Sequence, residues 1–296
     1  NNFVHEDNGL IVCDAPFDQM NPQIGLYSET ENSYVIFWDD KRSTGKAELT
    51  NIFCQSVTLG SGVGINISYL DGWNLVGLPL VISDNFYAAV FPDAIDNTLY
   101  SFVDQIYTLV DTLMHGKGYW LRFDSAGIAA ITGTPINELT INLNEGWNLV
   151  SGITETISVY SISDPDSIVI ENTIYGFTNT YEVSEILIPG EGYWLRAFQD
   201  GEITLTSDAT ARLSSHEFSL KDKVNTLSIN GMDLYFGLEL SFSERLSYSL
   251  PPKPPMGAFD ARFSGDWIYP VESNIIEVMH NQEPLRVDYN IKLEGQ

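Results

Sequence analysis

Apolar and polar residues alternate along much of the chain, which is the pattern of strands with one buried face. The segments 65–69 and 286–293 alternate cleanly. Four more segments combine β-branched and aromatic residues, namely 34–40, 51–57, 234–240 and 259–263. The proline-rich segment 250–255 cannot enter a central strand and should form an extended connector. Only the stretch after Pro92 and the segment 164–166 look like short helical turns or loops. The pattern predicts an all-β protein of β-sandwich-like or barrel-like modules.

A tandem repeat organises the middle of the chain. ISYLDGWNLV at 67–76 returns as INLNEGWNLV at 141–150, and GKGYWLR at 116–122 returns as GEGYWLR at 190–196. Two separated blocks that keep the same spacing indicate a duplication. We therefore predict two units of one fold, repeat 1 at 65–133 and repeat 2 at 139–207.

Each repeat contains two segments that read as buried strands, GWNLV and GYWLR. Asp71-Gly72 precedes the first and is typical of a hairpin turn. We expect the aromatic residues of both strands to form the repeat core: Trp73, Tyr119 and Trp120 in repeat 1, and Trp147, Tyr193 and Trp194 in repeat 2. Their apolar neighbours favour burial. The alternative is a carbohydrate-binding platform, with the tryptophans exposed on one sheet face.

Residues 1–58 form a separate segment with a different pattern. Trp38, Asp40 and Arg42 fit the motif W-x-D-x-R, followed by an I-F-x-Q strand at 52–55. The segment resembles one blade of the β-propellers of bacterial secreted proteins. A propeller typically needs four or more blades. We therefore expect the strand at 34–39 to present an edge that the rest of the chain or another copy covers.

Residues 208–296 form the C-terminal module, predicted to be β-sandwich-like. The segments LYFG, LPPKPP and FDARF resemble the region that precedes C-terminal sorting domains in large secreted bacterial proteins. The GWNL and GYW repeats are similar to those of the same kind of protein. The resemblance implies an extracellular or cell-surface location and says little about activity.

The chain carries a formal net charge of −26. Such a surface repels nucleic acid and anionic lipid, so neither is an expected partner. The sequence has no run of 18 apolar residues, so we predict no membrane insertion. Cys13 and Cys54 form a disulfide or remain two separate thiols, and their spacing leaves both alternatives open.

No motif points to catalysis. The four histidines lack zinc-site spacing, and the glycine-rich segment 60–64 reads as a linker. The acidic loops 93–97 and 164–166 occupy equivalent places in the two repeats and are weak Ca²⁺ candidates. The alternative is two solvated turns, since neither loop fits the EF-hand pattern. We predict no cofactor.

These observations favour a non-catalytic structural or assembly part of a secreted or surface-anchored bacterial protein, such as a spacer, stalk or filament subunit. Its partners would be other protein modules or copies of itself. Two alternatives remain open. One is a carbohydrate- or surface-binding adhesin module with a glycan ligand, and the other is an accessory region of a larger secreted hydrolase.

Overall fold

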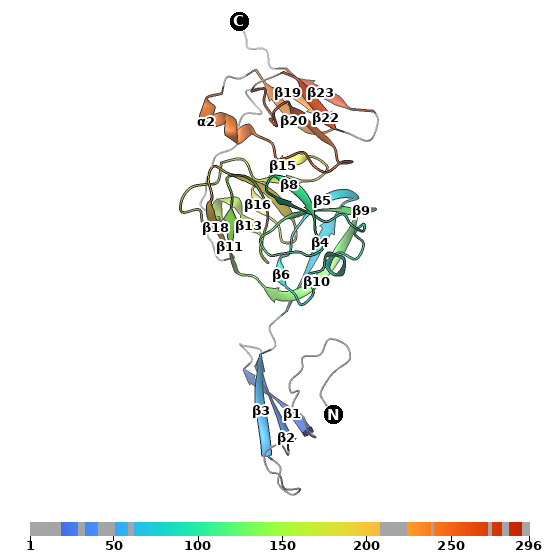
Figure 1. The fold of residues 1–296 in the computed structure, drawn as a ribbon, viewed down its shortest axis with the longest axis vertical. Coiled ribbons are helices and arrows are strands. Elements are labelled where there is room, and N and C mark those ends of the chain that lie inside the picture. The colour runs from blue at the N-terminus through green and yellow to red at the C-terminus, as the bar shows by residue number, and fades with distance from the viewer. Residues whose placement is uncertain are drawn as a thin grey trace. The chain divides into compact units, whose positions relative to one another are not determined.

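The computed structural model describes residues 19–28, 33–40, 51–58, 62–207, 224–237, 240–271, 274–279 and 284–291. Strands dominate these residues, and the two α-helices, α1 (Tyr87–Val90) and α2 (Phe242–Arg245), have four residues each (Figure 1). The predicted all-β class is confirmed. The chain divides into two compact units, residues 1–63 and 64–296.

The first unit is a three-stranded antiparallel sheet in the order β1-β2-β3 (Figure 1). Its strands are β1 (Gln19–Ser28), β2 (Ser33–Asp40) and β3 (Asn51–Thr58). The prediction that residues 34–39 form an open edge strand is therefore wrong, because β2 is the central strand and pairs on both sides. The sequence did not predict the strand β1, because Pro22 lacks an N–H and is more typical of a turn. The sheet accommodates it at a register shift between Met20 and Gln23.

Each repeat contains a four-stranded sheet of the same strand order and a smaller sheet. The smaller sheet of repeat 1 has the strand order β4 (Val63–Tyr69), β10 (Gly127–Pro135), β6 (Leu80–Val81). Its four-stranded sheet has the order β5 (Gly72–Val76), β9 (Tyr119–Phe123), β7 (Tyr100–Val103), β8 (Ile106–Leu109). In repeat 2, β11 (Glu138–Leu143) pairs with β18 (Gly201–Thr206). The four-stranded sheet of repeat 2 has the order β12 (Gly146–Ser151), β17 (Gly192–Ala197), β14 (Tyr175–Phe177), β15 (Tyr181–Val183). Equivalent residues keep the same register, since Trp73 faces Arg122 as Trp147 faces Arg196.

The stretch after Pro92 and the segment 164–166 form turns, one of the two predicted alternatives, and the short helical segments lie just upstream of them. α1 ends before Pro92, and the 3-10 helix η1 (Val159–Ser161) ends before Asp164. Repeat 2 also has a small pair, β13 (Ile157–Ser158) with β16 (Ile186–Leu187).

The turn between β4 and β5 is not the predicted hairpin. The two strands belong to different sheets, so the chain at Asp71-Gly72 crosses from one sheet to the other. The side chain of Asn74 closes this crossing by bonding both the N–H and the carbonyl of Leu70, each at 2.9 Å. Asn148 bonds Asn144 in the same way. The asparagine of GWNLV is therefore a structural clamp.

The GYWLR strands are buried on both faces, which explains their continuous apolar run. In β9, Tyr119, Leu121 and Phe123 point into the core of repeat 1, where Phe123 stacks on Tyr69 at 3.8 Å. Trp120 points to the opposite face and is 0% exposed. That face belongs to a second core, which the two repeats share.

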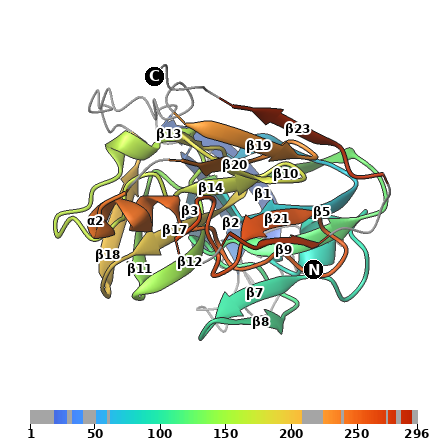
Figure 2. The ribbon, with the colours of Figure 1, turned by 90° about the horizontal axis from the view of Figure 1, so that it is seen from above.

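The C-terminal module adds two small sheets. β19 (Asn225–Ile229) lies between β20 (Met232–Phe236) and β23 (Val287–Asn290) (Figure 2). β21 (Asp260–Phe263) pairs with β22 (Ile276–Met279). Leu234, Leu250 and Ala261 are each 0% exposed and belong to the same core as the two repeat tryptophans. The repeats and the C-terminal module therefore share one core in addition to the interiors of the single repeats, which accounts for the compact unit 64–296.

Candidate functional site

The centre of the unit 64–296 is an aromatic cluster in which the repeats exchange equivalent contacts. Phe102 of repeat 1 packs edge-on against Trp194 of repeat 2, with ring centroids 4.7 Å apart at 81°. Phe177 of repeat 2 packs on Trp120 of repeat 1 at 4.8 Å and 80°. The two repeats are therefore related by an approximate twofold axis, as two subunits of a symmetric dimer would be.

Backbone contacts between the repeats follow the same symmetry. Val76 bridges Glu191, and Val150 bridges Lys117 at the equivalent place. Equivalent hydrogen bonds flank the two bridges: Gly77 N–H to Gly190 O at 2.9 Å, and Ser151 N–H to Gly116 O at 3.1 Å. Isolated backbone bridges thus join the two repeats at both equivalent places.

The glycine before each Tyr-Trp pair allows this approach. A Cβ at Gly192 would lie 2.9 Å from the carbonyl oxygen of Val76, and one at Gly118 would meet the carbonyl oxygen of Val150 at closer range. Backbone atoms cannot yield as a flexible side chain can. The glycines are therefore needed for contact between the repeats.

Two tyrosines connect the cluster to the C-terminal module. The Tyr107 hydroxyl donates to the carbonyl of Lys253 at 2.8 Å, and the equivalent Tyr181 hydroxyl donates to the adjacent carbonyl of Pro252 at 2.7 Å. Burial raises the pKa of both hydroxyls well above the usual value of tyrosine. The proline-rich segment 250–255 thus caps the cluster of both repeats.

A buried arginine holds this cap in place. Arg262 is 0% exposed and donates two hydrogen bonds of 2.6 Å to Asp260, with others to Pro251 O and Asp266. Burial works against the charge of Arg262, but the hydrogen bonds and charge of Asp260 outweigh it and raise the pKa of the guanidinium. The FDARF and LPPKPP segments therefore form one buried polar network.

The predicted core residues fall into two groups. Tyr119, Trp120, Tyr193 and Trp194 are at most 2% exposed, whereas Trp73 and Trp147 are half-buried at the margin of the shared core. The Tyr119 hydroxyl accepts from Met114 N–H, as that of Tyr193 does from Ile188 N–H, both at 2.9 Å. Each of these tyrosines therefore also fixes the loop before its own strand.

The structure does not decide between a disulfide and two separate thiols for Cys13 and Cys54. Cys13 lies outside the described residues, and Cys54 lies in β3. Arg42 of the W-x-D-x-R motif also lies outside the described residues.

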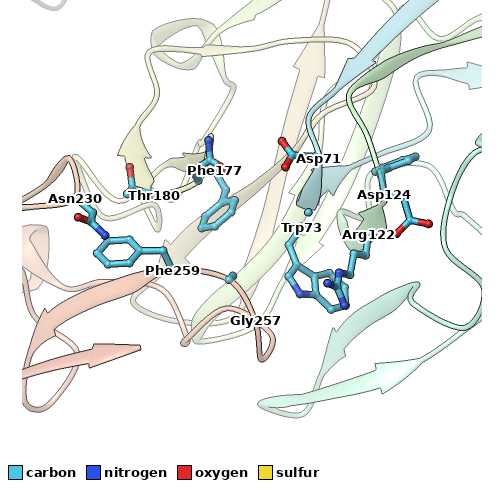
Figure 3. Close-up of a pocket in the computed structure, with 13 residues that line it drawn as sticks. Asp71, Trp73, Arg122, Asp124, Phe177, Thr180, Asn230, Gly257 and Phe259 are labelled. Atoms are coloured by element: carbon cyan, nitrogen blue, oxygen red, sulfur yellow. The ribbon is translucent and has the colours of Figure 1, made fainter. Parts of the chain in front are cut away.

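A cleft of about 410 Å³ opens beside Trp73, between repeat 1, the β14–β15 hairpin and the C-terminal module. Figure 3 shows Trp73, Arg122 and Asp124 on one side of the cleft and Phe177 and Phe259 on the other. The Trp73 indole N–H donates to the carbonyl of Met256 at 3.1 Å, which fixes the ring in place. Its edge packs against Trp120 at 6.4 Å.

Polar groups complete the lining of the cleft. Asp71 lies at the β4–β5 crossing, and Asn179, Thr180 and Asn230 come from two turns (Figure 3). Aromatic faces with carboxylate, amide and guanidinium groups can hold the apolar faces and hydroxyls of a sugar ring. The lining contains no histidine, cysteine or serine. The cleft is therefore suited to binding and offers no nucleophile with an adjacent imidazole base.

Both acidic loops use carboxylates for internal hydrogen bonds. Asp164 accepts from the N–H groups of Ile168 and Val169, each at 2.9 Å. Asp93 accepts from the Tyr69 hydroxyl at 2.7 Å. Within the described ranges, no three His, Cys, Asp or Glu residues are grouped so that they could hold a metal ion.

Sequence reasoning missed the residues that join the modules. Tyr107 and Tyr181 recur at the repeat spacing, which marks them as equivalent but not as contacts for the segment 250–255. Arg262 could have been suspected, because an arginine in an otherwise apolar strand needs a carboxylate partner such as Asp260. The cleft combines residues from 71 to 259, and no local pattern brings these together.

Comparison of the chain with protein-family models, with curated proteins and with solved structures finds no match in any of the three. Among the described helices, none has the length and apolar character needed to cross a membrane.

Proposed function

We propose that this chain is a non-catalytic structural or assembly part of a secreted or surface-anchored protein. The location is supported by the acidic composition and by the resemblance of the GWNL and GYW repeats to those of secreted bacterial proteins. The structural role is supported by one observation above all. Two repeats and a C-terminal module share a single aromatic core and so form one compact unit.

This core suits a spacer or an assembly unit. Among the described residues, the strongly shifted titrating groups are buried structural ones, namely Tyr107, Tyr175, Tyr181, Tyr193, Tyr235 and Arg262. Tyr107 and Tyr181 hold the C-terminal module on the repeats, and Arg262 holds the segment 250–255 that they bind. The groups with perturbed pKa values thus lie in packed contacts of the core, and they do not form a set of acid–base groups in a cleft.

Scanning calorimetry of the full chain tests the structural role. The unit 64–296 should melt in one transition whose calorimetric and van't Hoff enthalpies agree, and the unit 1–63 should contribute separately. Separate transitions for the repeats and for the C-terminal module would contradict a single rigid unit. A synthetic substrate panel that shows turnover would overturn the non-catalytic assignment.

The Trp73 cleft supports a second candidate function, the binding of a glycan. The specific observation is a half-buried tryptophan beside Arg122, with phenylalanine and amide groups across the gap (Figure 3). In this role the chain would act as a carbohydrate-binding adhesin module or as an accessory region of a larger secreted hydrolase.

A glycan array followed by tryptophan fluorescence titration tests this candidate. Arg122→Ala should weaken binding about tenfold, since it removes a charge-assisted hydrogen bond. Arg196→Ala is the matched control, because Arg196 is the equivalent residue of repeat 2 and lies outside the cleft. Equal losses in both variants, or no glycan bound, would exclude the cleft as a sugar site.

A further inference from the structure

The strand β23 forms one edge of the sheet β20-β19-β23 (Figure 2). Arg286 O accepts from Asn230 N–H at 2.9 Å, so the backbone groups of Arg286 face β19. In an antiparallel ladder this direction alternates, and the groups of Leu285, Val287 and Tyr289 point away from the sheet. Among the described strands, none pairs with that outer side.

The side chains of the same alternate residues form an apolar stripe. Leu285, Val287, Tyr289 and Ile291 are 36%, 53%, 74% and 56% exposed. Val287 pairs with Ile229, which is 5% exposed, so the stripe continues the buried face of the sheet. An open edge with an apolar face is a template for another strand.

The sequence of this edge is self-complementary. Arg286 and Asp288 flank Val287, and they form an exposed ion pair of 2.8 Å within the strand. If two copies of β23 pair antiparallel about Val287, then Arg286 of each lies opposite Asp288 of the other. Leu285 lies opposite Tyr289 in the same arrangement. Opposite charges and apolar pairs across strands both stabilise a sheet.

We propose that β23 is a homodimerisation edge, where two copies of the chain join their sheets about a twofold axis at Val287. This inference rests on the assembly role proposed above and names its surface. The outward backbone groups of Leu285, Val287 and Tyr289 become the hydrogen-bonded positions of the new ladder. The joined sheet has six strands, three from each copy.

The charges select this register over its neighbours. An axis at Asp288 would place two aspartates directly opposite each other. An axis at Tyr289 would bring Arg286 opposite Lys292. Like charges at opposite positions are destabilising. Only the axis at Val287 pairs every charge in the segment 286–288 with an opposite one.

Sedimentation equilibrium of the full chain tests the proposal. The wild type should reach twice the 33.0 kDa mass of one chain. Arg286→Asp and Asp288→Arg should each raise the dimer dissociation constant about tenfold or more, since both symmetric pairs become repulsive. The double variant R286D/D288R should restore the dimer. Asp166→Arg, a charge reversal in an exposed loop, is the matched control and should leave the dimer unchanged.

Cysteine cross-linking tests the register. Two Val287→Cys chains should form a disulfide dimer, because hydrogen-bonded antiparallel partners lie within disulfide reach at about 5.5 Å. Asp288→Cys should cross-link weakly, and the wild type gives the background of its two cysteines. A monomeric wild type, or a dimer that ignores these charge reversals, overturns the proposal. The calorimetric test of the proposed function is run on the Arg286→Asp variant, because dimer dissociation would otherwise couple to unfolding, so the two proposals can fail separately.

Discussion

Repeat 1 and repeat 2 have the same interior and different surroundings. Trp73 donates its indole N–H to Met256 of the C-terminal module, whereas the equivalent Trp147 lies under the guanidinium of Arg196 at 5.8 Å. In contrast, Phe102 and Phe177 make nearly identical contacts with the tryptophan of the other repeat. The two repeats therefore remain alike where they contact each other and differ at Trp73 and Trp147, of which only Trp73 bonds the C-terminal module.

The hairpins at the centre show how a length difference is absorbed. Four residues separate Phe102 from Tyr107, with Asp104 and Gln105 at positive φ in the two-residue β7–β8 turn, whereas three residues, including Asn179 at φ 78°, separate Phe177 from Tyr181. Phe102 still pairs with Tyr107, and Phe177 with Tyr181. The turn thus changes while the aromatic pair that enters the shared core does not.

The largest effects should come from the central tryptophans. Trp120→Ala and Trp194→Ala should each lower the free energy of unfolding by about 3–5 kcal/mol, because both rings are fully buried. The two losses should agree, since the residues are equivalent. Trp147→Ala removes a half-buried ring and should cost less. Urea denaturation measures all three, and a Trp147→Ala loss equal to that of Trp194→Ala would place Trp147 in the centre of the core.

The glycines between the repeats should be the next most sensitive positions. Gly118→Ala and Gly192→Ala should each cost about 1–3 kcal/mol through overpacking. The cost at Gly118 should be larger, because its added Cβ would lie nearer to a carbonyl oxygen than the 2.9 Å found at Gly192. Gly176→Ala is the control, since its nearest neighbour atom lies 3.5 Å away. Thermal unfolding can rank the three variants, and equal costs would contradict the close approach.

Alkaline pH should destabilise the fold through its buried tyrosines. Burial raises the folded-state pKa of Tyr107 and Tyr181 above the value of about 10 in the unfolded chain. Above pH 10 the unfolded state therefore releases protons that the folded state retains. Each tyrosine then lowers the free energy of unfolding by about 1.4 kcal/mol per pH unit. Tyr107→Phe and Tyr181→Phe should each reduce this slope by one such contribution, and an unchanged slope would contradict their burial.

The smallest effect should come from Lys117 and Glu191, which occupy equivalent positions in the two repeats. Burial raises the pKa of the Glu191 carboxyl, although the hydrogen bond from Tyr193 opposes this. A raised folded-state pKa adds stability at low pH that is lost as pH rises through it. Glu191→Gln should therefore remove the stability that is lost as pH rises above the unfolded carboxyl pKa of about 4.3, a change of less than about 1 kcal/mol. Lys117→Gln is the matched control and should leave that region of the curve unchanged.

The sequence predicted the repeats because GWNLV and GYWLR return at a constant spacing. It did not predict the crossing at Asp71-Gly72, since the same dipeptide serves a hairpin or a change of sheet, and the Asn74 clamp decides between them. Nor could it pair Phe102 with Trp194, because the symmetry between the repeats is a tertiary property. The cleft could not be predicted for the same reason, although Trp73 itself was a candidate for carbohydrate binding.

Native-state hydrogen exchange of the full chain tests the shared core most directly. The amides of Trp120, Trp194 and Leu234 lie in β9, β17 and β20, one strand from each module of the unit 64–296. If the three modules share one core, these amides should exchange through one opening reaction with the same free energy and the same dependence on denaturant. Leu234 exchanging through an opening of lower free energy, while the two tryptophan amides stay protected, would contradict the account.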